Sequence, residues 1–248
     1  MATHATPRLE IAANSLASAL VAQDAGAARI ELCASLGEGG LTPSYATIAL
    51  ARDRLRIPLY VLIRPRAGDF LYSDAEIETM LGDIEACVRL GCDGVVVGAL
   101  DADGDVAISR CRALIAAAGR LGVTFHRAFD LARDPQRALE DIVMLGCERI
   151  LTSGQRASAP EGAASIRALI ELAGARIVVM PGAGIDSSNI AALRDATGAR
   201  EFHASAKRVL ASGMRHSPAV PFADMQSGEM RSDAAEIRRM RAALERTD

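Results

Sequence analysis

Short hydrophobic runs alternate with longer amphipathic segments along the whole chain. The runs are rich in β-branched residues, which is typical of buried strands, and the amphipathic segments have the length of helices. The predicted strands span residues 9–13, 29–33, 58–64, 94–100, 123–129, 149–153, 176–182 and 201–205. The predicted helices span residues 15–25, 44–54, 74–90, 105–119, 135–145, 161–173 and 187–197, and an eighth is less clear. This alternation predicts βα units around a parallel sheet.

A short repeat supports a count of eight units. The segments AGAARIEL, LGCDGVVV, LGCERILT and TGAREFHA each join a helix end, a glycine and a strand. The glycines suit the left-handed backbone position that ends a helix; they are Gly26, Gly91, Gly146 and Gly198. Eight units in 248 residues match the size of a (β/α)8 or TIM barrel, whereas a doubly wound sheet normally has fewer strands. We therefore predict a TIM barrel with an irregular extension and an extra C-terminal helix.

The regular pattern stops after residue 207. We expect a single domain over residues 1–248, with the barrel over about 8–207 and the extension over 208–248. Residues 208–232 contain two prolines and two glycines and show little periodicity, which is typical of an extension or a lid. Ser232 and Asp233 then precede a charged amphipathic helix, which we expect on the outside of the barrel or at an oligomer interface.

Composition narrows the classes of function. A net charge of −3 and a pI of about 5.9, without a basic stripe, argue against a nucleic-acid partner. No segment reaches the roughly 18 apolar residues of a membrane helix, and residues 1–15 do not resemble a secretory signal, so we expect a cytoplasmic protein. The five cysteines are odd in number and lack CxxC spacing, which indicates neither a disulfide framework nor a zinc cage.

Polar side chains gather on one face of the predicted strands. Alternate strand residues point into the interior of a barrel, and active sites lie at its C-terminal rim. The polar face carries Glu10, Glu31, Cys33, Arg64, His126, Asp130, Thr152, Glu201, His203 and Ser205, whereas the opposite face is almost wholly apolar. An unpaired charge in a dry interior costs several kcal/mol, so these groups must pair, bind a ligand, or both.

Two interpretations of this polar face are open. In the first, the face is a functional pocket with four candidate catalytic residues; they are Glu10, Glu31, His126 and His203. In the second, it is a structural network in which Arg64 bridges Glu10 and Glu31 while the histidines bond backbone carbonyls. The convergence of polar residues from five strands favours the pocket.

Loops at the expected mouth add candidates for anion binding. Arg64 and Arg66 flank a proline, and arginine suits bidentate contact with carboxylate or phosphate. The segment PGAGIDSSN places Gly182 and Gly184 where backbone amides approach a ligand, but it lacks the third glycine of a dinucleotide fingerprint. The predicted anion or substrate set is Arg64, Arg66, Thr152, Gly182, Gly184 and Ser205. Salt-bridged loops and an ordinary helix cap are the alternative interpretation.

Six segments resemble the signature segments of the CutC family, long named for copper homeostasis. They are RIELCASLGEGGLTPS, VLIRPRAGDFLYSDAEIE, VTFHRAFD, CERILTSGQ, IVVMPGAGI and EFHASA. The resemblance runs in order from about Leu9 to Met214. It implies a TIM barrel, a cytoplasmic location, frequent homo-oligomers and a role in copper handling.

The resemblance also implies a copper site that uses cysteines in the first two strands. The second cysteine is Cys33, but the first falls at Ala12 in this sequence. Copper(I) prefers soft ligands, so a site here would need His126, His203 or Met180 beside its single thiolate.

Three functions follow as hypotheses. The first is copper binding through Cys33. The second is an enzyme acting on a small anionic metabolite, such as a phosphorylated one, with Glu31 and His126 or His203 moving protons; a variant places another divalent metal on Glu10, Glu31 and the histidines. The third is a non-catalytic oligomeric scaffold, whose barrel mouth would leave no room for a ligand.

Overall fold

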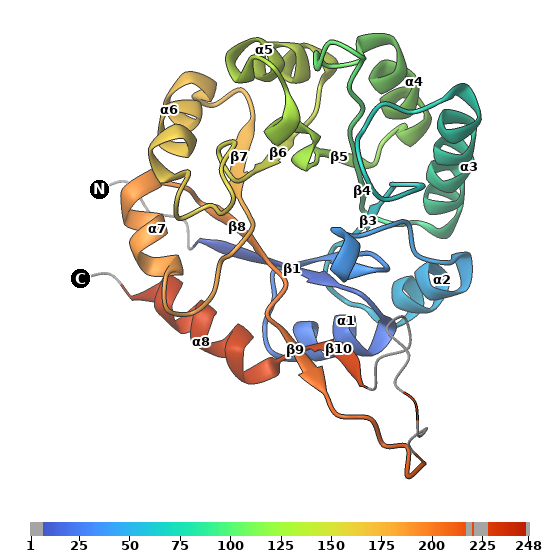
Figure 1. Ribbon diagram of the computed structural model, residues 1–248, viewed down its shortest axis with the longest axis vertical. Helices are drawn as coiled ribbons and strands as arrows, with labels where there is room; N and C mark the ends of the chain where they lie inside the picture. Colours follow the sequence, from blue (N-terminus) through green and yellow to red (C-terminus); the bar gives the residue numbers. More distant parts are fainter. Residues whose placement is uncertain (1–6, 217–219, 221–227, 247–248) are drawn as a thin grey trace.

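The computed structural model describes residues 7–216, 220 and 228–246 (Figure 1). Eight parallel strands form a barrel, as predicted. They are β1 (Arg8–Ala13), β2 (Arg29–Leu32), β3 (Leu59–Leu62), β4 (Gly94–Val97), β5 (Gly122–Phe125), β6 (Arg149–Thr152), β7 (Val178–Pro181) and β8 (Glu201–Ala204). Strand β1 pairs with both β2 and β8, and a single bridge between Gly182 and His203 joins β7 to β8. This bridge closes the barrel.

Helices surround the strands, and their ends follow local capping chemistry. They are α1 (Leu16–Asp24), α2 (Tyr45–Arg54), α3 (Asp74–Leu90), α4 (Ile108–Ala118), α5 (Pro135–Leu145), α6 (Ala163–Ala173), α7 (Ile190–Thr197) and α8 (Ala234–Glu245). Ser73 and Glu76 form a capping box at the start of α3. The four repeat glycines have φ angles between +71° and +91°, which confirms their predicted left-handed conformation. None of the helices in the described ranges is long and apolar enough to cross a membrane.

Helix α8 takes the place of the eighth barrel helix. It packs between α7 and α1, as Figure 1 shows, and its apolar stripe of Ile237, Met240 and Leu244 is buried. The sequence pattern assigned this helix to an extension because a non-periodic insertion separates it from β8. The ring of helices therefore includes residues beyond the expected boundary at 207.

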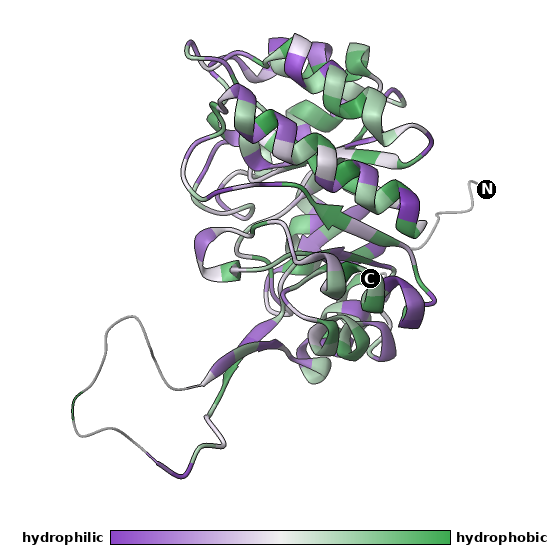
Figure 2. Cartoon of the chain, turned by 90° about the vertical axis from the view of Figure 1, so that its right-hand side faces the viewer, coloured by the Kyte–Doolittle hydropathy of each residue, from purple (hydrophilic) through white to green (hydrophobic). Residues whose placement is uncertain are grey.

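The insertion between β8 and α8 includes a two-stranded antiparallel ribbon. Strands β9 (Lys207–Leu210) and β10 (Glu229–Ser232) form it, and it projects from the barrel wall (Figures 1 and 2). Two side-chain contacts from the region of α1 hold its base, from Asn14 to Met230 and from Ser18 to Ser232. Parts of the predicted lid, residues 217–219 and 221–227, lie outside the described residues.

The strands separate two interiors of different character. Their outward side chains, such as Ile11, Ile30 and Phe202, are fully buried under the helices in an apolar core. The barrel interior carries the polar face, as the alternation predicted. Strand β5 is shorter than the predicted 123–129, because the His126 ring accepts a hydrogen bond from the Ala128 amide and a short 3-10 helix, η2 (Arg127–Leu131), begins there. This turn places His126 at the mouth of the barrel.

Candidate functional site

A cavity of about 270 Å³ opens at the mouth of the barrel. Its polar lining consists of Glu31, Glu38, Arg64, His126, Arg127, Asp130 and His203. Its apolar wall consists of Leu62, Phe70, Leu131 and Leu151. Four of the predicted site residues therefore meet around one space that has room for a small ligand. The closed mouth expected of a scaffold is not what this part of the chain forms.

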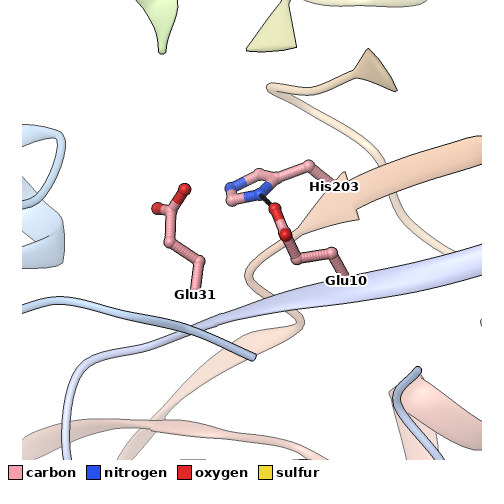
Figure 3. Close-up of side chains that lie close together, drawn as sticks. All are labelled: Glu10, Glu31 and His203. Atoms are coloured by element: carbon pink, nitrogen blue, oxygen red, sulfur yellow. Dashed lines mark hydrogen bonds and ion pairs between the residues drawn. The ribbon is translucent and has the colours of Figure 1, made fainter. Parts of the chain in front are cut away.

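His203 lies between two glutamates beside this cavity (Figure 3). Its Nδ1 is 2.7 Å from Oε1 of Glu10. Glu31 lies on the other side of the imidazole ring, and its Oε2 is buried without a hydrogen-bond partner in the part of the chain that the structure describes. Strand register explains the meeting: β1 lies between β2 and β8, so Glu10 aligns with His203 while Ala12 aligns with Glu31. The Glu10 carboxylate thus orients the ring, and the Glu31 carboxyl keeps bonding capacity.

Buried ion pairs fill the barrel interior toward the N-terminal ends of the strands. Arg29 contacts Oε2 of Glu10 and donates to Oε2 of Glu201 at 2.8 Å. Arg149 donates to the same oxygen of Glu201 at 2.6 Å. The guanidinium carbons of Arg29 and Arg149 lie 5.1 and 5.5 Å from the centre of the Tyr60 ring. Each charge in this network has a partner.

The pKa values of the two glutamates beside His203, Glu10 and Glu31, are shifted in opposite directions. Burial alone would raise the pKa of Glu10, but the Arg29 charge and the bond to His203 outweigh it and lower this pKa to about 2. Burial, reinforced by the charge of Glu10, raises the pKa of Glu31 to about 7 despite the opposing charge of His203. Burial favours the neutral form of His203, but Glu31 and Glu10 outweigh it and raise the pKa of the ring.

His126 is a second buried ring of the cavity. Its Nδ1 accepts a hydrogen bond of 3.1 Å from the Ala128 amide, and its Nε2 is buried without a hydrogen-bond partner among residues 7–216, 220 and 228–246. Burial, helped by the positive charge of Arg64, lowers the pKa of His126 to about 3. The ring is therefore neutral over the physiological pH range.

Arg64 makes contacts that differ from the predicted structural network. Its guanidinium donates to the backbone carbonyls of Glu38, Gly40 and Gly68 at 2.8 to 2.9 Å, and no carboxylate of the described residues pairs with it. The alternative interpretation, in which Arg64 bridges Glu10 and Glu31, was wrong, because Arg64 follows the end of β3 and turns into the loops. Arg29 is the residue that pairs with Glu10. The same interpretation had the histidines bond backbone carbonyls, which was also wrong, since one bonds a carboxylate and the other an amide.

The other predicted anion-binding residues do not line the cavity. Arg66 pairs with Glu76 and Asp69 outside it. Thr152 donates to Asp130 at 2.5 Å, so it positions a residue of the lining.

The two predicted glycines and Ser205 lie near the closure of the barrel. A Cβ atom at Gly182 would lie 2.5 Å from Leu151, and one at Gly184 would lie 2.9 Å from Ser158. Both glycines therefore allow close packing. Ser205 directly follows β8 and is half-buried outside the cavity lining.

Comparison with known proteins identifies the family. The model of the CutC family matches residues 7–208 of the chain. This chain belongs to the CutC family. A curated CutC family protein of Xanthomonas campestris pv. campestris (strain B100) is 59% identical over 230 residues, which cover 93% of this chain and 95% of the relative. One of Xanthomonas axonopodis pv. citri (strain 306) is 58% identical and covers 96% of this chain and 98% of the relative.

A solved CutC structure supports the same assignment. The Streptococcus agalactiae protein, which is named for copper homeostasis, has a TM-score of 0.77 and 33% sequence identity to this chain. The match covers 80% of this chain and 98% of that chain. The predicted CutC membership and barrel are therefore confirmed.

Cys33, the remaining cysteine of the copper site that the CutC resemblance implied, lies among apolar side chains. It packs with Tyr60, Leu62 and Val96, and its thiol donates to the Ala13 carbonyl at 3.7 Å. Burial raises the pKa of this thiol. The cluster of candidate metal ligands in the described ranges is instead Glu10, Glu31 and His203, whose ligand atoms lie within 4.8 Å of one another.

The sequence interpretation missed Arg29 and Arg149. Each lies two residues before an interior-facing residue, Glu31 and Leu151 respectively, so strand alternation places both side chains in the barrel interior. Reading the alternation back to the first residue of each strand would have found them. They stabilise the charge of Glu10 and Glu201.

Proposed function

We propose that this CutC protein is an acid/base enzyme that acts on a small anionic metabolite at the mouth of the barrel. One observation carries the proposal. A carboxyl oxygen of Glu31 is buried beside the cavity without a hydrogen-bond partner among the described residues, next to an imidazole that Glu10 orients. A buried polar atom without a partner is unfavourable, so such atoms point to a ligand or a catalytic role.

The pair of Glu31 and His203 suits proton transfer. General acid/base catalysis works best when the pKa of the catalytic group lies near the working pH. The raised pKa of Glu31, about 7, agrees with this requirement. The contact from Glu10 to Nδ1 leaves Nε2 of His203 as the ring nitrogen for substrate or for Glu31.

The charges of the cavity favour an anionic substrate. Arg64 donates to backbone carbonyls, so its positive charge is not neutralised by a carboxylate of the described residues. Arg127 adds a second, half-exposed guanidinium, although Asp130 pairs with it. A cavity of about 270 Å³ limits the ligand to a small molecule.

The residues do not fit a copper(I) thiolate centre. Copper(I) prefers soft thiolate or thioether ligands, whereas Ala12 replaces one cysteine and Cys33 is 1% exposed in an apolar cluster. A copper(I) titration against a competing chelator tests this interpretation on the wild type and on Cys33→Ala. We expect no difference between them, and a loss of copper binding in the variant would contradict us.

A second candidate function is binding of a borderline divalent metal. Glu10, Glu31 and His203 offer oxygen and nitrogen atoms within 4.8 Å of one another, and such a metal would act there as a Lewis acid. The contacts from Glu10 to Arg29 and His203 compete with this use. Calorimetric titration with Zn²⁺ or Mn²⁺ distinguishes metal binding from acid/base catalysis without a metal. Metal binding by the wild type that is lost in Glu31→Gln would support the metal site, and any other result would not.

An isotope experiment tests the enzyme. The protein is incubated with a metabolite extract in D2O and, separately, in H2¹⁸O, and mass spectrometry compares the wild type with Glu31→Gln. We expect some anionic compounds to change mass or amount, and the rate to fall by about 10²–10⁴ in the variant.

Glu38→Gln is the matched control, since Glu38 also lines the cavity but contacts Arg64 through its backbone carbonyl rather than through its side chain. It should retain the wild-type rate. If wild type and Glu31→Gln give the same compounds at the same rate, the proposal is wrong.

A cytoplasmic location and a homo-oligomeric state are further predictions from the family resemblance. Cell fractionation tests the first, and light scattering on the purified chain tests the second. A purely monomeric protein at micromolar concentration would contradict the predicted oligomer.

A further inference from the structure

His126 is held in one orientation from three sides. A Cβ atom at Gly98 would lie 2.6 Å from the ring, so this glycine makes the space that the imidazole occupies. The Phe70 ring packs against it with centroids 4.8 Å apart. The Ala128 amide donates to Nδ1 at 3.1 Å. The ring therefore presents Nε2 in a defined position at the cavity.

The hydrogen bond from Ala128 assigns the tautomer. An amide N–H needs a lone pair on Nδ1, so Nδ1 carries no proton. A neutral imidazole has one N–H, which must then be on Nε2. Burial and the charge of Arg64 both disfavour a second proton. His126 is thus a buried, neutral donor whose Nε2–H has no partner among the described residues.

We propose that the substrate is an aldehyde or ketone that carries an anionic group, and that Nε2–H of His126 donates to its carbonyl oxygen. This inference rests on the proposed function, because Glu31 supplies the base. It changes the role predicted for His126 from moving protons to stabilising charge on oxygen.

The step is a reversible enolisation. The Glu31 carboxylate takes a proton from the carbon next to the carbonyl, the C–H electron pair forms the new C=C bond, and the carbonyl π pair moves onto oxygen. His126 stabilises the resulting enolate oxygen. Returning the proton to carbon restores the electron count, and exchange at Glu31 replaces it with a solvent proton. Neutral histidines polarise substrate carbonyls in the same way in other barrel enzymes.

A neutral donor suits a carbonyl better than it suits an anion. Arg64 lines the same cavity, so its positive charge is available to the anionic group of the substrate. The same charge, together with burial, keeps His126 neutral. A carbonyl oxygen bears little charge until the reaction proceeds, so a fixed donor there strengthens its bond in the transition state. The cavity therefore separates anion binding from carbonyl activation.

The tautomer is tested by NMR on the full chain labelled with ¹⁵N-histidine. Long-range ¹H–¹⁵N spectra from pH 5 to 8 should show one histidine with Nδ1 unprotonated and Nε2 protonated at every pH. The signal is assigned by its loss in His126→Phe and, independently, in His126→Gln. A ring with its proton on Nδ1, or one that gains charge in this range, overturns the inference.

The substrate class is tested on the compounds that exchange deuterium with dependence on Glu31. Each should contain an aldehyde or ketone next to the exchanging carbon. In His126→Phe, which keeps an aromatic ring beside Phe70, kcat should fall by about 10²–10³ with KM changed less than about threefold. His126→Gln retains a donor and should recover part of this loss.

The outcomes separate the two proposals. Glu31-dependent chemistry on compounds without a carbonyl would overturn the role of His126 and leave the proposed acid/base function standing. Equal kcat values in wild type and His126→Phe would do the same. If no compound reacts with dependence on Glu31, the proposed function fails, and the carbonyl inference fails with it.

Discussion

The two ends of the barrel interior differ in whether their buried polar groups have hydrogen-bond or ion-pair partners. Toward the N-terminal ends of the strands, Arg29 and Arg149 both pair with Glu201, and Arg29 also pairs with Glu10. At the mouth, Glu31 and His126 each keep a buried polar atom without a partner in the described part of the chain.

This difference separates support from function. A closed network of ion pairs stabilises and orients the residues within it, whereas an open set of polar atoms is unfavourable until a ligand binds. Glu10 belongs to both, because its two oxygens contact Arg29 on one side and His203 on the other. The ion-pair network therefore positions the imidazole of His203, which lines the cavity at the mouth. Variants of the network should mainly reduce the free energy of unfolding, whereas variants at the mouth should mainly affect binding and activity.

Breaking the closed network of ion pairs should have the largest effect on stability. We expect Arg29→Met to reduce the free energy of unfolding by about 3–5 kcal/mol, because it leaves the buried carboxylates of Glu10 and Glu201 without one partner. Urea denaturation measures this loss. Arg66→Met is the control, since Arg66 pairs with acids outside the cavity and should lose less than about 1 kcal/mol. Equal losses would contradict the assignment of the two arginines to different environments.

Removing the charge of the mouth should weaken anion binding. Arg64→Met is expected to raise the Kd for inorganic phosphate or malonate by about 10- to 100-fold, which corresponds to a charged contact of about 1.5–3 kcal/mol. Isothermal titration calorimetry measures the Kd, with Arg66→Met as the control outside the cavity. An unchanged Kd in Arg64→Met would exclude Arg64 from the anion site.

The neutral ring at the mouth should produce a dependence of stability on pH. The pKa of His126 is lowered from its ordinary value of 6.5 to about 3 in the folded chain. Between pH 3 and pH 6.5 the unfolded chain therefore binds more protons at this residue than the folded chain does. The stabilisation is present above pH 6.5 and is lost as pH falls, by up to about 1.4 kcal/mol per pH unit. Urea denaturation at several pH values should show this loss in the wild type and less of it in His126→Phe. If the free energy of unfolding fell equally with pH in both proteins, the His126 ring would take up protons equally in the folded and unfolded chains.

The smallest effect is expected for Glu31→Gln. The variant keeps the side-chain volume and replaces a carboxyl oxygen that has no hydrogen-bond partner in the described ranges, so the free energy of unfolding should change by less than about 1 kcal/mol at pH 7. Glu10→Gln should lose several times more, because it weakens contacts to both Arg29 and His203. Comparable losses in the two variants would show that Glu31 also has a structural role.

Much of the barrel follows from the order of residues. Strand positions, the left-handed glycines and the polar face are local features, set by periodicity and backbone sterics. The partners of each charge are not local. The alternative interpretation as a structural network paired Arg64 with Glu10 and Glu31 because it shares their face, but Arg64 lies at the end of β3 and bonds loop carbonyls instead. Likewise, α8 is eighth in the ring although an irregular insertion hides its relation to β8.

The amino-acid pattern alone specifies that acids, histidines and arginines enter the barrel, because a period of two leaves each side chain only one face. Only the folded barrel specifies which of them are satisfied. Closure brings β8 beside β1 and lets Glu10 orient His203, and a turn after β5 bonds one side of His126. Those contacts join residues far apart in the chain or depend on a local bend. Tertiary structure thus decides that Oε2 of Glu31 and Nε2 of His126 are buried without a hydrogen-bond partner among the described residues.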